Sequence, residues 1–168
     1  MSTQENLLEM LDYLKSSAKV PFSVEVEKVG RGFEEFIPHA DLVLVSKEVA
    51  QYNGCGDMKA ACARFSLQLR TGARLVVAWG EAGAACWEAG TGTTVCPAHP
   101  PPGGVVDTLG AGDTFNAVVV GSLAAGRGLQ DSVQLACRVA GAKVGFRGFD
   151  QLGGEAKELV NKTLGFTN

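Results

Sequence analysis

Two short and almost continuous apolar runs place the strongest constraint on how this 168-residue chain folds. Residues 41–46 read DLVLVS, residues 74–79 read RLVVAW, and a helical pattern lies between them over residues 59–70. A strand that is apolar on both faces needs cover on both faces, which is typical of parallel strands joined by a helix. The pattern therefore predicts an α/β protein in which helices cover both faces of a parallel sheet.

The other segments extend this arrangement of strand, helix and strand. Residues 23–28 alternate apolar and charged side chains, as an edge strand does, and glycines at residues 89–92 separate two short strands that form a predicted hairpin. The predicted hairpin strands are residues 84–88 and 93–98, and the other predicted helices are residues 5–15, 34–39, 113–124 and 129–145. No internal repeat is visible, so these elements are expected to form one domain.

Composition indicates a folded chain without a strongly charged partner. Lys and Arg number 15 against 18 Asp and Glu, so the net charge is −3, and 46% of the residues are hydrophobic. The charge balance argues against a protein that holds a nucleic-acid backbone by bulk charge. The apolar fraction excludes a disordered chain, and the length is enough for one compact domain with a sizeable core.

Targeting signals and cysteine spacing favour a cytoplasmic protein. Residues 1–10 lack the basic and then apolar pattern of a signal peptide, and the most apolar stretch, residues 115–126, is shorter than the ~20 residues that span a bilayer. No membrane partner is therefore expected. The five cysteines are odd in number and none has zinc-site or redox spacing, so reduced thiols are expected at Cys55, Cys62, Cys86, Cys96 and Cys137.

A glycine-rich segment at the start of a predicted helix is the most informative motif. Gly110 and Gly112 flank Ala111, and Asp113 stands in the first turn of the helix that follows. Glycines allow a tight turn that points free N–H groups at one place, and these groups and the helix dipole attract an anion such as phosphate. A carboxylate beside that anion can take a proton from a hydroxyl nucleophile. The motif therefore points to phosphoryl transfer to an alcohol.

The same residues also allow a plainer interpretation, in which Gly110 and Gly112 form an ordinary turn and Asp113 only caps a helix. The spacing alone does not decide between the two. Two other kinds of nucleotide site are disfavoured. No glycine-rich loop ends in Gly-Lys-Ser/Thr, and the six-residue dinucleotide pattern is absent after every predicted strand. A hydride-transferring Rossmann enzyme is therefore a poor match.

Residues 107–115 (DTLGAGDTF) resemble the second signature of the ribokinase-like, or pfkB, carbohydrate kinases. Further strings resemble the ketohexokinases of that family in the same order along the chain, at residues 24–28, 45–50, 78–79, 100–102, 139–141 and 148–150. The resemblance covers about residues 23–152. It implies a three-layer α/β/α ribokinase-like fold and a kinase that phosphorylates fructose to fructose 1-phosphate.

The resemblance also implies roles for individual residues. Asp113 would be the base that deprotonates the sugar hydroxyl, and Gly110, Ala111 and Gly112 would form the anion hole for the transferred phosphoryl group. The implied ATP contacts are a phosphate loop at Gly80, Glu81, Ala82 and Gly83 and an adenine pocket that includes Pro101, Ala136, Cys137 and Ala140. Without the resemblance, residues 80–83 could equally be an ordinary turn at the end of a strand. Small residues on the last helix would then indicate close packing, and Cys137 would be a thiol of the core. His99 is expected to be a plain loop residue, and His39 a surface helix residue.

ATP and Mg²⁺ are the cofactors that the resemblance implies, and a requirement for K⁺ stays open. Many relatives use an Asn-x-x-Glu motif to position Mg²⁺, whereas the equivalent residues 46–49 read Ser-Lys-Glu-Val. No metal ligand is therefore assigned, and either Glu81 or water molecules would have to take that part.

Length is the larger departure from the family pattern. The chain resembles only the C-terminal, nucleotide-binding half, so residues 1–168 are expected to be a single partial domain. The half that is expected to be missing carries the sugar-binding residues and the β lid, which also forms the family homodimer. Two hypotheses follow: a kinase whose small-molecule partners are ATP and fructose, or a catalytically inactive nucleotide-binding fragment of such a kinase.

Overall fold

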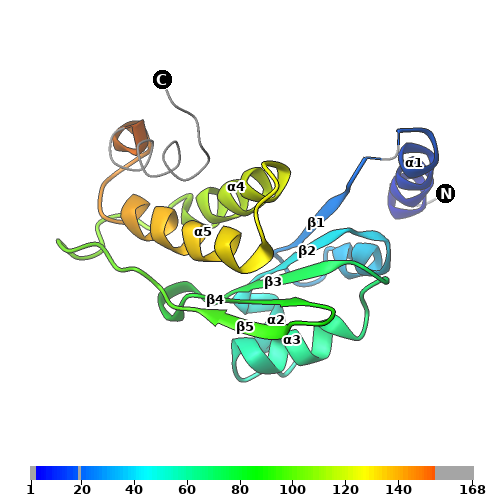
Figure 1. The fold of residues 1–168 in the computed structure, drawn as a ribbon, viewed down its shortest axis with the longest axis horizontal. Coiled ribbons are helices and arrows are strands. Elements are labelled where there is room, and N and C mark those ends of the chain that lie inside the picture. Colours follow the sequence, from blue (N-terminus) through cyan, green and yellow to red (C-terminus); the bar gives the residue numbers. More distant parts are fainter. Residues whose placement is uncertain (1–2, 19, 154–168) are drawn as a thin grey trace.

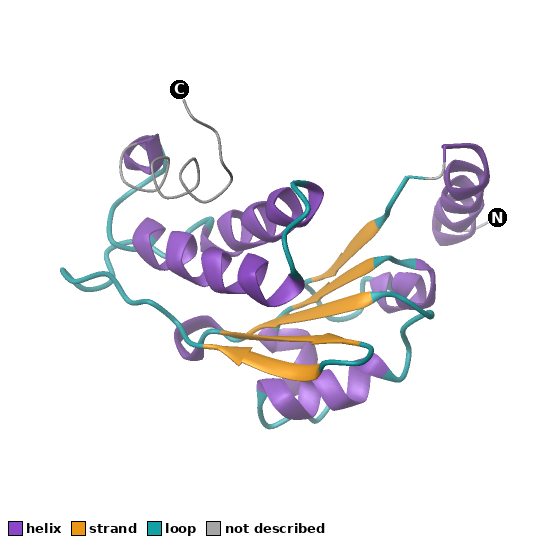
Figure 2. Ribbon diagram, viewed as in Figure 1, coloured by secondary structure: helices purple, strands orange, loops and turns teal. Residues whose placement is uncertain are grey.

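A five-stranded sheet with helices on both faces organises the computed structural model, which describes residues 3–18 and 20–153 (Figure 1, Figure 2). The helices are α1 (Thr3–Ala18), α2 (Lys47–Tyr52), α3 (Met58–Ser66), α4 (Ala111–Ala124) and α5 (Leu129–Lys143), with short 3-10 helices at Phe33–His39, Gly80–Ala82 and Asp150–Gly153. The strands are β1 (Ser23–Val26), β2 (Leu42–Val45), β3 (Arg74–Ala78), β4 (Ala84–Glu88) and β5 (Gly92–Cys96). The predicted three-layer α/β/α arrangement is confirmed.

The strands follow one another across the sheet in the order β1-β2-β3-β4-β5. β1, β2 and β3 run parallel, whereas β4 is antiparallel to both β3 and β5. The prediction of a parallel sheet is therefore correct for the first three strands and wrong at the junction of β3 and β4. Only residues 79–83 connect these two strands, and a parallel crossover needs a dozen residues or more.

The two central parallel strands explain why their sequences are apolar throughout. Val43 and Val45 of β2 belong to the core under α2 and α3, whereas Leu42 and Leu44 belong to the core under α4 and α5. β3 divides its side chains in the same way, with Val77 on the first side. Figure 1 shows α4 and α5 over one face of the sheet and α2 and α3 over the other.

Some element boundaries differ from those predicted. α2 was not anticipated, because six residues give too little periodicity; it begins where Ser46 Oγ accepts a hydrogen bond from Val49 N at 3.1 Å. α3 ends at Ser66 instead of residue 70, and α4 begins at Ala111, two residues before the predicted start. No helix in the described part of the chain has the length and apolarity to cross a bilayer.

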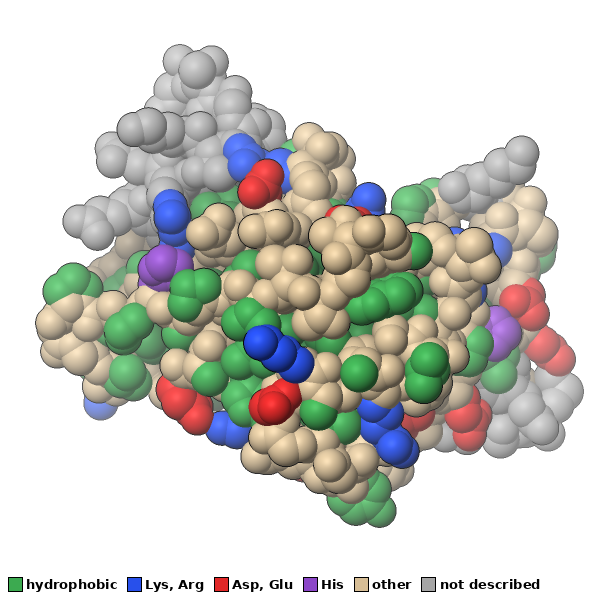
Figure 3. Space-filling view, turned by 60° about the horizontal axis from the view of Figure 1, so that its bottom comes forward, with side chains coloured by type: hydrophobic (Ala, Val, Ile, Leu, Met, Phe, Trp, Pro, Cys, Tyr) green, Lys and Arg blue, Asp and Glu red, His purple; other side chains and the backbone are tan. Residues whose placement is uncertain are grey.

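Charged side chains of both signs share the surface, and the thiols lie in the interior. On the face seen in Figure 3, basic and acidic side chains are interspersed and form no broad patch of one sign. All five cysteines lie within the described residues, and all are buried and free of disulfides.

Candidate active site

Two cavities open where the parallel strands end and α4 begins. The first, of about 480 Å³, is called the acidic cavity because three carboxylates line it; its lining residues include Glu25, Glu27, Ser46, Thr108, Gly110, Gly112, Asp113 and Asn116. The second, of about 390 Å³, is called the apolar cavity; it is lined by residues that include Gly80, Glu81, Gly83, His99, Pro101, Cys137, Ala140 and Val144. Ligands of open α/β sheets bind at the carboxyl ends of the strands, and both cavities lie there.

One short segment separates the two cavities and lines both of them. Thr108, Gly112 and Phe115 face the acidic cavity and the apolar cavity alike. We call residues 108–113 the anion turn. Gly110 precedes α4 with φ +74°, a left-handed conformation that side chains with a Cβ rarely adopt. This glycine allows the chain to turn sharply into the helix between the cavities.

Several backbone N–H groups of the anion turn have no acceptor in the part of the chain that the structure describes. Ala111 N donates to Thr108 O at 3.1 Å, and Thr114 N donates to Gly110 O at 2.9 Å. The amides of Gly110, Gly112 and Asp113 donate to no acceptor among the residues that the structure describes. The predicted anion-hole residues therefore lie together at a helix N-terminus, but the Ala111 amide is already engaged, whereas the Asp113 amide meets no acceptor within residues 20–153.

Asp113 is exposed at this end of α4 and lines the acidic cavity. One turn later on the same helix, Asn116 Nδ2 donates to Glu25 Oε1 at 2.6 Å and links α4 to β1. Burial raises the pKa of Glu25, the bond from Asn116 counteracts that rise, and the negative charges of Glu27 and Asp113 add to it. Sequence reasoning missed Glu25 and Asn116, although an acid at the end of a parallel strand was a usable signal.

The apolar cavity collects most of the predicted adenine-pocket residues. Pro101, Cys137 and Ala140 line it, but Ala136 does not, because that side chain is fully buried between α5 and the sheet. Burial raises the pKa of Cys137 to about 12, with a further contribution from Cys96, so this side chain is a neutral thiol. The part of the wall formed by Pro101, Cys137 and Ala140 is thus uncharged, although Glu81 also lines this cavity.

The predicted phosphate loop lines part of the apolar cavity. Gly83 has φ +99°, and a Cβ there would lie 2.2 Å from Cys96 O, so only glycine allows this close approach of two backbones. Gly80 and Glu81 also line the cavity, whereas Ala82 does not. Lys47 Nζ donates to Glu81 Oε1 at 2.7 Å, and this bond is the main reason that the pKa of Glu81 is lowered.

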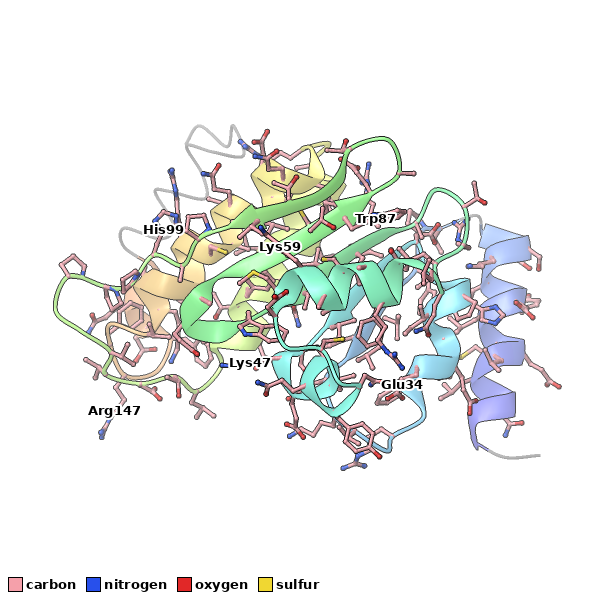
Figure 4. The ribbon with its side chains drawn as sticks, turned by 90° about the horizontal axis from the view of Figure 1, so that it is seen from below. Glu34, Lys47, Lys59, Trp87, His99 and Arg147 are labelled. Atoms are coloured by element: carbon pink, nitrogen blue, oxygen red, sulfur yellow. The ribbon has the colours of Figure 1, made fainter. Side chains whose placement is uncertain are left out.

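His99 is a cavity residue that sequence reasoning left as a plain loop position. It lines the apolar cavity, and its Nε2 atom is buried without a hydrogen-bond partner in the described structure. Figure 4 shows His99 on the loop after β5 and Lys47 at the start of α2. The signal for His99 was its place directly before three prolines that were themselves assigned to the pocket.

The oxygen ligands around the acidic cavity suit a hard cation such as Mg²⁺. Glu25, Glu27 and Asp113 all line that cavity, but within the described ranges no three acidic, histidine or cysteine side chains converge as a metal-binding group. The residue at the motif's glutamate position, Val49, is fully buried. These residues fit a Mg²⁺ that takes most of its ligands from phosphates and water, which is common for this ion.

Comparison with known proteins agrees with this geometry. The sequence profile of the pfkB family carbohydrate kinases matches residues 2–151. The chain belongs to the pfkB family. Ketohexokinase from Mus musculus is 42% identical over 132 residues, which cover 79% of this chain and 44% of that relative. The chain therefore spans less than half the length of this curated relative.

Solved structures share the pfkB fold. Ribokinase from Arabidopsis thaliana, solved with ribose and ATP, superposes with a TM-score of 0.71 at 22% identity, covering 95% of this chain and 52% of that one. Ribokinase from Giardia lamblia gives a TM-score of 0.69 at 16% identity, with 96% of this chain and 55% of that one covered. At these identities the likeness concerns the fold alone.

Proposed function

We propose that this chain is the nucleotide-binding part of an ATP-dependent sugar kinase of the ketohexokinase type, which transfers the γ-phosphate of ATP to the 1-hydroxyl of fructose. The shared wall of the two cavities is the observation that supports this proposal most. A phosphoryl group that passes from the apolar cavity to the acidic one has to cross the anion turn with its free amides. The identity with a ketohexokinase over most of the chain supports the same substrate class.

The apolar cavity suits the base of ATP, and the loop at residues 80–83 suits its phosphates. The amides of Gly110, Gly112 and Asp113 would hold the charge that develops on the transferred phosphoryl group. Mg²⁺ bound with ATP would neutralise part of the phosphate charge. In this arrangement the chain itself contributes position and hydrogen bonds, which dominate catalysis of phosphoryl transfer.

Asp113 would act as the general base from the acidic cavity. Its carboxylate takes the proton of the sugar hydroxyl, the hydroxyl oxygen forms a bond to the γ-phosphorus, and the bond from that phosphorus to the β-phosphate oxygen breaks. ADP and fructose 1-phosphate are the products. Asp113 is well suited to this because its side chain is exposed to a bound acceptor, while its backbone amide helps to hold the phosphoryl group.

Fructose-dependent formation of ADP by the purified 168-residue chain tests this function. The Asp113→Asn variant is expected to lower turnover by about 10²–10⁴-fold, the usual contribution of a general base, while ADP affinity stays nearly unchanged. Glu34→Gln is the matched control, because Glu34 lines neither cavity and lies far from His99 in Figure 4. Loss of ADP affinity in Asp113→Asn would instead assign Asp113 a structural role.

A second function is favoured by the length of the match, because the chain covers only 44% of the ketohexokinase relative. A nucleotide-binding chain without catalysis would bind ADP through the apolar cavity but lack the groups that fix the sugar in line. Such positioning can account for ~7–11 kcal/mol of a reaction barrier. ADP binding without any fructose-dependent turnover would support this alternative.

A further inference from the structure

Lys143 is a lysine with no exposed surface, and it stands in the last turn of α5. Its ammonium nitrogen donates to Asp107 O at 3.0 Å and to Asp107 Oδ2 at 3.3 Å. The same nitrogen lies 5.3 Å from the ring centroid of Phe149. Burying an ammonium group is costly unless it is paired and hydrogen-bonded, so a fully buried lysine calls for a specific reason.

Asp107 stands directly before the anion turn and is the centre of a small network. Its Oδ1 accepts from Leu109 N at 3.0 Å, inside the turn, and its Oδ2 accepts from Gly148 N at 3.1 Å as well as from Lys143. These bonds lower the pKa of Asp107, with the Leu109 and Gly148 amides contributing most and Lys143 adding to them. The carboxylate is therefore ionised and ties the turn to the segment after α5.

Two further contacts join the same segments. Val106 N and Asp107 N donate to Val144 O at 2.7 Å and 3.2 Å, so the segment that leads into the turn lies beside the end of α5. On the other side of the turn, the Phe149 ring packs against Gly110, where an added Cβ would lie 2.2 Å from the ring. The turn is thus held between the Asp107 network and an aromatic ring that itself covers the buried ammonium.

We propose that Lys143 is a positioning residue for phosphate binding, because its buried ammonium fixes Asp107 and thereby the anion turn. Without the ammonium, the Asp107 carbonyl and carboxylate lose their common partner, and only the backbone bonds to Val144 and Gly148 still join the segment before the turn to the end of α5 and the residues after it. The amides of Gly110, Gly112 and Asp113 then no longer share one fixed orientation. Lys143 reaches phosphate only through Asp107 and does not itself line either cavity. This inference rests on the proposed function.

The test compares ADP with adenosine, which shares the base and ribose but has no phosphate. Calorimetric titration of the full chain is expected to show that Lys143→Met weakens ADP binding about tenfold, the scale of an indirect coupling between contacts, and leaves adenosine binding unchanged. The matched control is Arg147→Met, which removes an exposed cation of the same segment; Figure 4 shows Arg147 pointing away from the molecule. This control is expected to bind both ligands as the original chain does.

Two results would overturn the proposal. One is ADP binding by Lys143→Met that equals that of the original chain, and the other is an equal loss of ADP and adenosine, which indicates general damage to the fold. If Lys143→Met does not fold, Phe149→Leu provides the test, because it loosens the turn from the opposite side and leaves no unpaired charge. A selective loss of ADP is expected there too, and an equal loss of both ligands contradicts the proposal. An original chain that binds no ADP would contradict the proposed function itself.

Discussion

The acidic and the apolar cavity share one wall and are built in opposite ways. The acidic cavity takes charged side chains from β1, from Glu27 just after it and from the first turn of α4, whereas the apolar cavity takes mostly backbone, prolines and small side chains from the loop after β5 and from α5, with Glu81 as its one carboxylate among the described lining residues. Charged groups suit proton transfer, and uncharged surfaces suit the face of a base. The difference teaches that a single helix start can line two cavities of opposite character, since Gly112 lines both of them while Asp113 lines only the acidic one.

Changing the shared wall is expected to have the largest effect, because it damages both cavities. Gly110→Ala forces a Cβ into a left-handed backbone position and against Phe149. We expect a loss of at least about 1–2 kcal/mol in the free energy of unfolding, from the backbone alone, together with weaker ADP binding. Chemical denaturation and calorimetric titration measure the two effects.

Gly112→Ala is the matched control for that change. Gly112 has no positive φ, and a Cβ there meets nothing within 4 Å. Alanine at this position in a helix should leave stability unchanged or raise it. Equal destabilisation by both variants would mean that the conformation of Gly110 is not what holds the wall in place.

Filling the apolar cavity is expected to affect the nucleotide side alone. Ala140→Leu adds volume to the cavity wall, and overpacking of this kind should weaken ADP and adenosine binding equally, by about tenfold. Ala63→Leu adds the same volume at an exposed position of α3 and should change neither affinity. Selective loss of ADP in Ala140→Leu would show that the cavity receives phosphates and not the base.

Thiol chemistry offers a milder probe of the same difference. Burial raises the pKa values of Cys137 and Cys62 to about 12. As long as the pH stays below that value, raising it by one unit should increase the rate of alkylation of each thiol about tenfold, because the thiolate is the reactive form. ADP is expected to slow alkylation of Cys137, which lines the apolar cavity, but not that of Cys62, which lies in the core on the other face of the sheet. Mass spectrometry of the labelled chain measures both rates, and equal protection of the two thiols would contradict the assignment.

The smallest expected effect concerns the acidic cavity and its pH dependence. Because the pKa of Glu25 is raised in the folded chain, the folded state binds more protons than the unfolded state between the two pKa values. Stability due to this group therefore falls as the pH rises through that window. Glu25→Gln keeps an acceptor for Asn116 but cannot ionise, so its stability relative to the original chain should increase with pH. A difference that stays constant across urea denaturations at several pH values would contradict this.

Much of the molecule was accessible from local pattern. The apolar runs at residues 41–46 and 74–79 became buried parallel strands, and Gly110 to Asp113 did form a helix start beside a cavity. The antiparallel turn from β3 to β4 was missed because alternation of elements says nothing about strand direction. Ala136 was grouped with Cys137 and Ala140 because small residues on one helix look alike in sequence, but the structure buries its side chain against the sheet and not along the apolar cavity.

Lys143 shows most clearly where sequence reasoning ended. It continues the buried spacing of Val133, Ala136 and Val139 along α5, so its burial could have been suspected from periodicity. Its partner could not, since Asp107 is 36 residues away and is reached only because α4 and α5 fold back on each other. The same holds for the link from Glu25 to Asn116, which joins residues 91 positions apart.

The sequence by itself determined the fold family, the two-sided burial of the central strands and the helix start at Gly110, for which phosphate binding stays a prediction. These depend on neighbouring residues, whose spacing sets backbone conformation and burial directly. Only the tertiary structure decided that the helix start divides two cavities, that Glu25 faces Asn116, and that a buried lysine holds the anion turn. Such contacts depend on how distant segments pack, and packing is set by the whole chain at once.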